Sequence, residues 1–85
     1  MKSSTTPSFW RAFEALPPEI KKSAEKAYEL WRRDPRHRSL RFERKGEYWS
    51  VRVSRGWRAL ARDHNGRLYW FWIGPHDQYE RIIRN

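Results

Sequence analysis

The sequence predicts an α+β fold, in which an N-terminal helical hairpin packs on a four-stranded antiparallel sheet and a short C-terminal helix follows. Three observations predict it. Apolar residues recur at helical spacing between prolines in the first third of the chain. Runs rich in aromatic and β-branched residues follow, separated by two glycine turns. Gly74-Pro75 then ends the last strand ahead of a short helix. With 85 residues there is room for one compact domain, residues 1–85.

The helical hairpin is bounded by prolines. Thr6-Pro7 is a start signal, because threonine caps free amide groups and proline fits the first helical position. Pro17-Pro18 ends this helix and begins the next, and Asp34-Pro35 ends the second helix. Residues 1–6 are expected to be flexible or a short edge strand. The apolar stripe is predicted to comprise Phe9, Ala12, Phe13, Leu16, Ile20, Ala24, Ala27, Tyr28 and Trp31.

Four strands are expected in the sheet. Leu40-Arg41-Phe42 alternates and is the expected first strand, and residues 47–54, 57–63 and 67–73 are the next three. The turn at Asn65-Gly66 should pair Arg62 with Tyr69 and Leu60 with Phe71.

The earlier turn sets which side chains share a face. Ser54-Arg55-Gly56 fits a three-residue loop with glycine in the left-handed position. Val53 then faces Trp57 and Arg52 faces Arg58, whereas a two-residue loop would separate the two arginines and bury a charge. The face expected to pack on the helices is Trp49, Val51, Val53, Trp57, Ala59, Ala61, Leu68, Trp70 and Trp72. The other face is expected to carry Tyr48, Ser50, Arg52, Arg58, Leu60, Arg62, Tyr69, Phe71 and Ile73.

The net charge of +9 is concentrated in the middle of the chain, where residues 32–62 carry eleven basic and three acidic side chains. This predicts a polyanionic partner, with nucleic acid ahead of an anionic membrane. The alternative is a basic, solvated surface. Because the chain has no cysteine and His37, His64 and His76 are not at ligand spacing, neither a metal site nor a cofactor is expected. No run is apolar enough for a membrane span or signal peptide, so a cytoplasmic protein is expected.

Two opposed arginines are the first candidate site residues. Arg52 and Arg58 would destabilise the hairpin unless a phosphate or an acidic partner neutralised them. Asp63, Asp77 or Glu80 could instead bridge them. The aromatic residues of this face could stack on bases or on one another. The predicted nucleic-acid contacts are Arg62, Arg41, Arg44, Lys45, Arg55, Tyr48 and Tyr69.

His76 and Tyr79 are the second pair of candidates. They are three residues apart and share a face of the last helix or its lead-in turn. His76 lies at the same strand end as Arg58, so the three side chains can converge, and a histidine is a natural proton donor or acceptor. Alternatively, His76 caps the helix and Tyr79 belongs to the core.

From Phe9 to Ile83 the chain resembles the RelE/ParE toxin superfamily of bacterial toxin–antitoxin systems. The most specific matches are the hairpin YWSVRVSRGWRAL and the segment FWIGPHDQYERII. The resemblance implies a concave face that inhibits an essential process and is masked by a cognate antitoxin. RelE-like members cut mRNA in the ribosomal A site without metal, through the 2′-hydroxyl, whereas ParE-like members poison DNA gyrase without chemistry of their own.

The resemblance assigns catalytic roles to four residues. Arg58 matches the arginine that holds the scissile phosphate, Arg52 the basic residue across from it, and Tyr79 the C-terminal tyrosine that stacks or shares a proton. His76 is the expected general acid. Some ribonuclease members carry a carboxylate where this chain has Arg36-His37-Arg38-Ser39, leaving His37 as the sole substitute for a general base. A ribosome-dependent endoribonuclease is thus expected, the alternatives being a gyrase inhibitor or a partner of the antitoxin that has lost toxicity.

Overall fold

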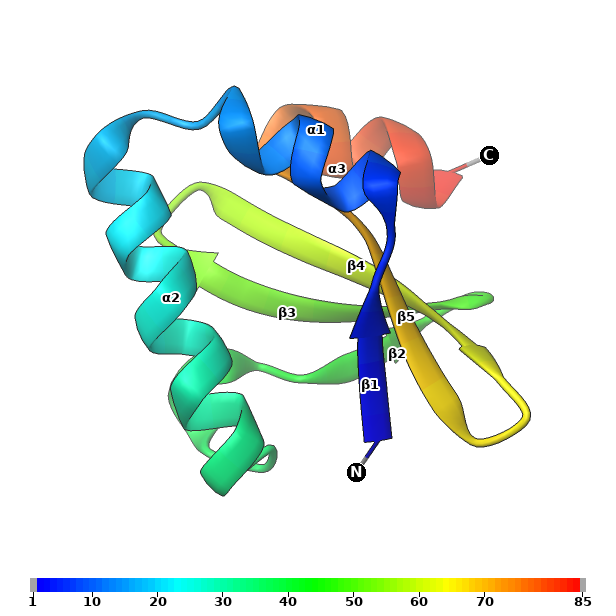
Figure 1. Cartoon of the computed structure of the whole chain (residues 1–85). Helices are drawn as coiled ribbons and strands as arrows, with labels where there is room; N and C mark the ends of the chain where they lie inside the picture. Colours follow the sequence, from blue (N-terminus) through cyan, green and yellow to red (C-terminus); the bar gives the residue numbers. More distant parts are fainter. Residues whose placement is uncertain (1, 85) are drawn as a thin grey trace.

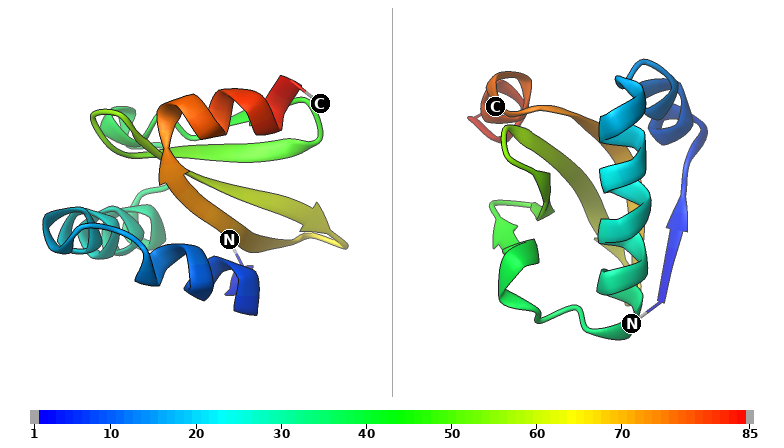
Figure 2. Two further views of the ribbon diagram at one scale, coloured as in Figure 1. Left: turned by 90° about the horizontal axis from the view of Figure 1, so that it is seen from above. Right: turned by 90° about the vertical axis from the view of Figure 1, so that its left-hand side faces the viewer.

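The chain folds into layers, with helices on both sides of a five-stranded mixed sheet (Figures 1 and 2). The computed structural model describes residues 2–84. The elements are β1 (Lys2–Thr5), α1 (Pro7–Glu14), α2 (Pro18–Arg33), the 3₁₀ helix η1 (Arg38–Leu40), β2 (Glu43–Lys45), β3 (Tyr48–Ser54), β4 (Trp57–His64), β5 (Arg67–Pro75) and α3 (His76–Arg84). The strand order is β1-β5-β4-β3-β2. Figure 2 shows α1 and α2 on one face of the sheet and α3 on the other.

The predicted boundaries of the first two helices are confirmed. The Thr6 side chain caps α1 by accepting a hydrogen bond from the backbone N–H of Phe9 at 3.3 Å, and Pro7 is the first helical residue. Helix α2 begins at Pro18 and ends at Arg33, directly before Asp34-Pro35. Within residues 2–84, no helix is long and apolar enough to cross a membrane.

The main core lies between α1, α2 and the sheet. Trp31 of α2 is 2% exposed and meets Trp70 of β5 edge to face, with ring centroids 5.4 Å apart. Such a pair adds to the stabilisation that burial of two large aromatic side chains already provides. The predicted stripe is wrong at Tyr28, which is 43% exposed; Leu30 packs against the core instead.

The sheet has one more strand than predicted, because β1 joins it. Residues 2–5 form the edge strand that was one of two expectations for this segment, and they pair in parallel with β5. The Arg67 guanidinium donates hydrogen bonds to the Ser3 carbonyl and to the Ser4 hydroxyl, at 3.1 and 2.9 Å. A parallel neighbour cannot be joined by a tight hairpin, so no local turn signal marks this pairing.

The predicted first antiparallel strand is wrong in position. Leu40 is the last residue of η1 and is 2% exposed, and Arg41 follows it in a left-handed conformation at φ +45°. The strand itself, β2, starts at Glu43 and pairs with β3. Leu40 and Phe42 are both buried in the core because the chain turns at Arg41, and not because they alternate along a strand.

The turn between β3 and β4 is shorter than predicted. Only Arg55 and Gly56 lie between the strands, and Ser54 is opposite Trp57. Gly56 has φ +80°, as expected for glycine here. An irregularity in the pairing leaves Val53 as an extra residue in β3. This bulge compensates for the shorter turn, so the residues before it keep the predicted register.

The turn between β4 and β5 follows the prediction. Asn65 and Gly66 have φ +52° and +81°, the positive values that a type I′ turn requires. Arg62 is opposite Tyr69, as predicted.

A second bulge changes the register further along β5. Leu60 is opposite Trp72 and not Phe71, because the pairing shifts between Leu60 and the next residue of β4. As a result, Trp72 packs beneath α3 and Ile73 joins the main core, which reverses both predicted faces. The Phe71 carbonyl at the bulge accepts a hydrogen bond from the Ser8 hydroxyl of α1 at 2.8 Å.

Candidate functional site

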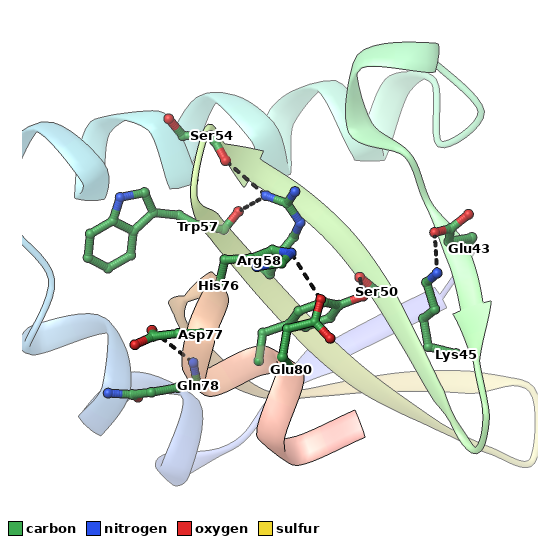
Figure 3. Close-up of polar contacts among 11 residues, drawn as sticks. Glu43, Lys45, Ser50, Ser54, Trp57, Arg58, His76, Asp77, Gln78 and Glu80 are labelled. Atoms are coloured by element: carbon green, nitrogen blue, oxygen red, sulfur yellow. Dashed lines mark hydrogen bonds and ion pairs between the residues drawn. The ribbon is translucent and has the colours of Figure 1, made fainter. Parts of the chain in front are cut away.

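Ionisable side chains gather where β3 ends, β4 begins and β5 passes into α3 (Figure 3). Arg52 of β3 is opposite Arg58 of β4, as predicted, and Gly74 of β5 lies on the other side of Arg58. The His76 backbone N–H donates to the Gly56 carbonyl at 2.8 Å. This bond fixes the start of α3 beside the hairpin that carries the arginines.

The guanidinium of Arg58 is held by the turn beside it. Its Nη1 donates to the carbonyls of Ser54 and Trp57, at 3.1 and 2.9 Å (Figure 3). Burial lowers the pKa of Arg58 below its ordinary value, and the positive charge of Arg52 lowers it further. No ion pair within residues 2–84 includes either arginine. The two arginines therefore bring two positive charges together, and neither charge is paired with a carboxylate.

His76 lies on α3 beside this charge and has an acidic neighbour. Its Nε2 is 3.4 Å from a carboxylate oxygen of Glu80, one helical turn later, and both side chains are partly exposed. The charge of Glu80 also acts on Arg58, where it opposes the lowering of the pKa. In the sequence, Glu80 stood out only as a possible bridge between the arginines. Its four-residue spacing from His76 on a predicted helix was the signal that could have placed it in the site.

Tyr79 is a core residue. It is 4% exposed and packs with Tyr48 and Leu60 beneath α3. Its hydroxyl oxygen accepts a hydrogen bond from the Ser50 hydroxyl at 3.3 Å. The structure thus follows the alternative of a core tyrosine, and the ring has no free face for stacking on a base.

The predicted aromatic platform is also largely covered. Tyr48 is 9% exposed, and the exposed guanidinium of Arg62 lies 5.3 Å from its ring and 5.1 Å from the ring of Phe71. The prediction of Tyr48 as a stacking surface is therefore wrong. Tyr69 is only partly buried, and its ring centroid is 6.4 Å from that of His64. Of the predicted platform, Arg62 and Tyr69 remain accessible at the end of the sheet away from Arg58.

The two basic residues of β2 lie on opposite faces of the sheet. Lys45 pairs with Tyr48, on the face of Arg58, whereas Arg44 pairs with Trp49, which packs against the helix-side core. Arg44 is exposed and lies on the face opposite to Arg58, so a nucleic-acid contact there would be apart from the arginine pair. The Lys45 ammonium is 3.0 Å from the Glu43 carboxylate, and this hydrogen bond and the charge of Glu43 raise the pKa of Lys45.

The remaining predicted residues lie around the cluster. Arg41 is exposed after η1, and its charge contributes to lowering the pKa of Arg58. Arg55 is exposed in the β3–β4 turn. His37, the substitute considered for a general base, caps η1 through Nδ1, which accepts from the Ser39 backbone N–H at 3.2 Å. No group of three His, Cys, Asp or Glu side chains within residues 2–84 could hold a metal ion.

A large hollow lies on the opposite face of the sheet. It has a volume of about 600 Å³ and is mainly apolar, with Phe9, Trp10, Tyr28 and Trp31 among its lining residues. It contains none of the candidate site residues. Its lining suits an apolar ligand or partner, so it is unlike the charged cluster at Arg58.

Comparison with solved structures places this fold among toxins. A YoeB/ParE toxin from Agrobacterium tumefaciens is 24% identical with a TM-score of 0.65, over 89% of this chain and 99% of that one. The RelB–RelE antitoxin–toxin complex from Methanococcus jannaschii matches at 13% identity and a TM-score of 0.65, over 92% and 95% of the two chains. The toxin–antitoxin complex RelBE2 from Mycobacterium tuberculosis matches at 22% identity and a TM-score of 0.61, over 87% and 95%.

Family comparison gives the same result for most of the sequence. No curated protein matches the chain. The model of the ParE-like toxin domain matches residues 18–81, which include all of α2, β2 to β5 and the first part of α3. The fold is that of the solved RelE and YoeB/ParE toxins, and the chain belongs to the ParE-like toxin domain family.

Proposed function

We propose that this toxin cleaves mRNA on the ribosome without a metal ion, by attack of a ribose 2′-hydroxyl on the neighbouring phosphate. The observation that carries the proposal is the Arg52–Arg58 pair, which has no carboxylate contact in residues 2–84 and lies beside His76 at the start of α3. Cleavage of RNA places additional negative charge on the phosphate and requires a proton for the leaving 5′-oxygen. The cluster supplies both kinds of group.

Each residue has a distinct role in this proposal. Arg58, whose guanidinium is oriented by two backbone carbonyls, stabilises the charge on the scissile phosphate. Arg52 adds a second positive charge across the strand pair. The 2′-hydroxyl gives its proton to water as its oxygen forms the new bond to phosphorus. His76 protonates the 5′-oxygen as the old bond breaks, and a 2′,3′-cyclic phosphate remains on the cut strand. Glu80 orients the His76 ring through the contact at Nε2, which makes it a positioning residue.

An antitoxin is the second proposed partner. The solved RelB–RelE and RelBE2 structures are toxin–antitoxin complexes, and the basic face of this chain suits an acidic partner. We expect an acidic or helical antitoxin segment to lie across Arg52, Arg58 and Arg62 and to cover the site. Toxin and antitoxin would meet in the cytoplasm, where translation occurs.

The test is a reconstituted translation reaction with purified protein, ribosomes and a programmed mRNA, followed by mapping of the RNA ends. Wild-type protein should cut the message at A-site codons. His76→Ala and Arg58→Lys should lose most cleavage, because the first removes the proton donor and the second keeps the charge without the planar donor pair. Arg58→Ala should remove toxicity and keep antitoxin binding. A fully toxic Arg58→Ala variant would show that the phosphate-stabilising role is wrong.

Matched controls separate the site from general loss of charge or of a histidine. Arg81 is an exposed arginine of α3, and His64 lies at the end of β4 away from Arg58. Arg81→Ala and His64→Ala should cut at close to the wild-type rate. If the control variants lost as much cleavage as the site variants, the loss would come from a change in net charge or in folding and not from the site.

Gyrase inhibition is the second candidate function, and the match to the ParE-like family favours it. A gyrase supercoiling assay with the same protein preparation distinguishes the two. Intact mRNA with inhibited supercoiling would replace the ribonuclease proposal and leave His76 as the first residue of α3 with no chemical role. If the protein neither cut mRNA nor inhibited gyrase, it would be a chain that has lost toxicity and only binds an antitoxin.

A further inference from the structure

A second hollow, of about 240 Å³, lies at the edge of β3 and borders the apolar one at Ala27 and Val53, which line both. Strand β2 pairs only with the first residues of β3, Tyr48 to Ser50, so the rest of the β3 edge is not covered by a strand. Helix α2 and the 3₁₀ helix η1 lie beside this edge, and both contribute residues to the hollow. The hollow is lined by Ser23, Lys26, Ala27, Leu30, Ser39, Leu40, Arg52 and Val53.

The polar groups of this hollow are two cations and two hydroxyls, with no carboxylate. No ion pair within residues 2–84 includes Lys26 or Arg52. The hydroxyls already have partners, since Ser23 donates to the Glu19 carbonyl at 3.2 Å and Ser39 Oγ is 2.9 Å from a ring nitrogen of His37. The cations are therefore the groups left to attract a ligand, and the ligand they fit is an anion.

The sequence around the hollow strengthens this charge. Arg36, Arg38 and Arg41 lie in or beside η1, and all three are exposed. These three charges add to the positive potential of the two cations that line the hollow. An extended polyanion would be drawn to this edge more strongly than a single small ion.

Arg52 connects the hollow to the candidate site. It lines the hollow and is also the residue opposite Arg58 on the neighbouring strand. Opposed residues of an antiparallel pair have Cβ atoms roughly 5 Å apart. A nucleic-acid strand with one phosphate at Arg58 can therefore bring a neighbouring phosphate to Arg52 and Lys26.

We propose that the hollow between α2, η1 and β3 binds a phosphodiester group of single-stranded RNA, with Lys26 and Arg52 as its cations. The proposal rests on the proposed function in taking RNA as the ligand, and it gives Lys26 a role that the sequence alone does not predict. Lys26 positions the message and takes no part in the chemistry, whereas Arg52 is shared with the candidate site. Its effect on binding should be independent of base sequence, because only phosphate is contacted.

The test uses the full chain and a single-stranded RNA oligonucleotide whose 2′-hydroxyls are methylated, so that binding is measured without cleavage. The affinity is determined at several salt concentrations for wild type, Lys26→Gln and Lys26→Arg. The control is Lys22→Gln, which removes the same charge from an exposed residue of α2 that does not line the hollow. The affinity falls as the salt concentration rises, so the slope of log affinity against log salt is negative. The loss of one phosphate contact to a single strand reduces the magnitude of this slope by about 0.7.

For Lys26→Gln, the magnitude of the slope should fall by about 0.7, and by the same amount on two unrelated base sequences. Lys26→Arg and Lys22→Gln should both keep the wild-type slope. Equal slopes for Lys26→Gln and Lys22→Gln would overturn the proposal. The proposal would also be overturned if Lys26→Gln bound the oligonucleotide as well as wild type does but bound message-free ribosomes or an acidic peptide more weakly. Either result would show that Lys26 contacts a different ligand. Because methylated RNA reports binding alone, a protein that fails to cut mRNA could still show the expected slopes, and the two proposals can fail separately.

Discussion

Arg52 and Arg58 face each other on neighbouring strands, and no ion pair within residues 2–84 includes either of them. Two like charges opposed in a strand pair destabilise the sheet. The cost is partly visible in Arg58, whose pKa is lowered by burial and by the charge of Arg52. An arrangement that costs stability in the free protein is explained if an anion binds there.

Replacing one of the opposed arginines should stabilise the protein and weaken its activity. Arg52→Thr removes the repulsion and introduces a good strand residue, so the free energy of unfolding should rise by about 0.2–1 kcal/mol in urea titrations. Cleavage of mRNA should fall in the same variant. Arg62→Thr is the control, because Arg62 faces Tyr48 and Tyr69 and has no opposed cation. A loss of stability in Arg52→Thr would mean that the pair is not repulsive.

The hydroxyl of Tyr79 should matter for folding more than for chemistry. In Tyr79→Phe the Ser50 hydroxyl keeps its burial and loses its acceptor, which should lower the free energy of unfolding by about 1–3 kcal/mol. Cleavage measured well below the unfolding temperature should be retained. Tyr28→Phe, at an exposed position, should change neither. Wild-type stability combined with lost cleavage would identify the hydroxyl as a proton partner after all.

Gly74 should tolerate no side chain while Trp72 is present. A Cβ at Gly74 would lie 2.5 Å from the Trp72 ring, so Gly74→Ala forces the ring to move and should cost about 1–3 kcal/mol of unfolding free energy. The cost should be much smaller when measured in a Trp72→Leu background, because the double-mutant cycle removes the clash. Equal costs in both backgrounds would place the strain in the backbone beside Arg58.

The contact between Lys45 and Glu43 should give stability that is lost at alkaline pH. Glu43 raises the pKa of Lys45 above its ordinary value of 10.5, so the folded state binds the proton more tightly than the unfolded state does. The stabilisation is fully present below the unfolded pKa and is lost as the pH rises through the folded pKa. Glu43→Gln should move the Lys45 titration, followed by NMR of the side chain, to lower pH. An unchanged titration would show that the pair does not persist in solution.

Local signals in the sequence were sufficient for the helices and turns. Proline restricts its own φ and the residue before it whatever surrounds them, so the bounds of α1 and α2 could be predicted at Thr6-Pro7 and Asp34-Pro35. The positive φ values at Asn65, Gly66 and Gly56 are equally local. The opposed arginines were predicted as well, although the loop length used to predict them was one residue too long.

Which side chains form the site was decided by packing between distant segments. Trp72 and Ile73 exchanged their predicted faces because β5 carries a bulge, whose free carbonyl is bonded by Ser8 from the other end of the chain. Tyr48 and Tyr79 are buried because α3 covers that face of the sheet, and alternation along a strand does not reveal which helix will lie over it. Glu80 belongs to the site only because α3 begins beside Gly56.

The sequence by itself determined helices α1 to α3, strands β3 to β5, the positions of both glycine turns and the family resemblance, because each depends on residues close together in the chain. The tertiary structure decided the parallel edge strand β1, both bulges and the hollow that joins Lys26 to Arg52. These features depend on contacts between segments far apart in sequence, where burial of large side chains and pairing of backbone groups outweigh local preference.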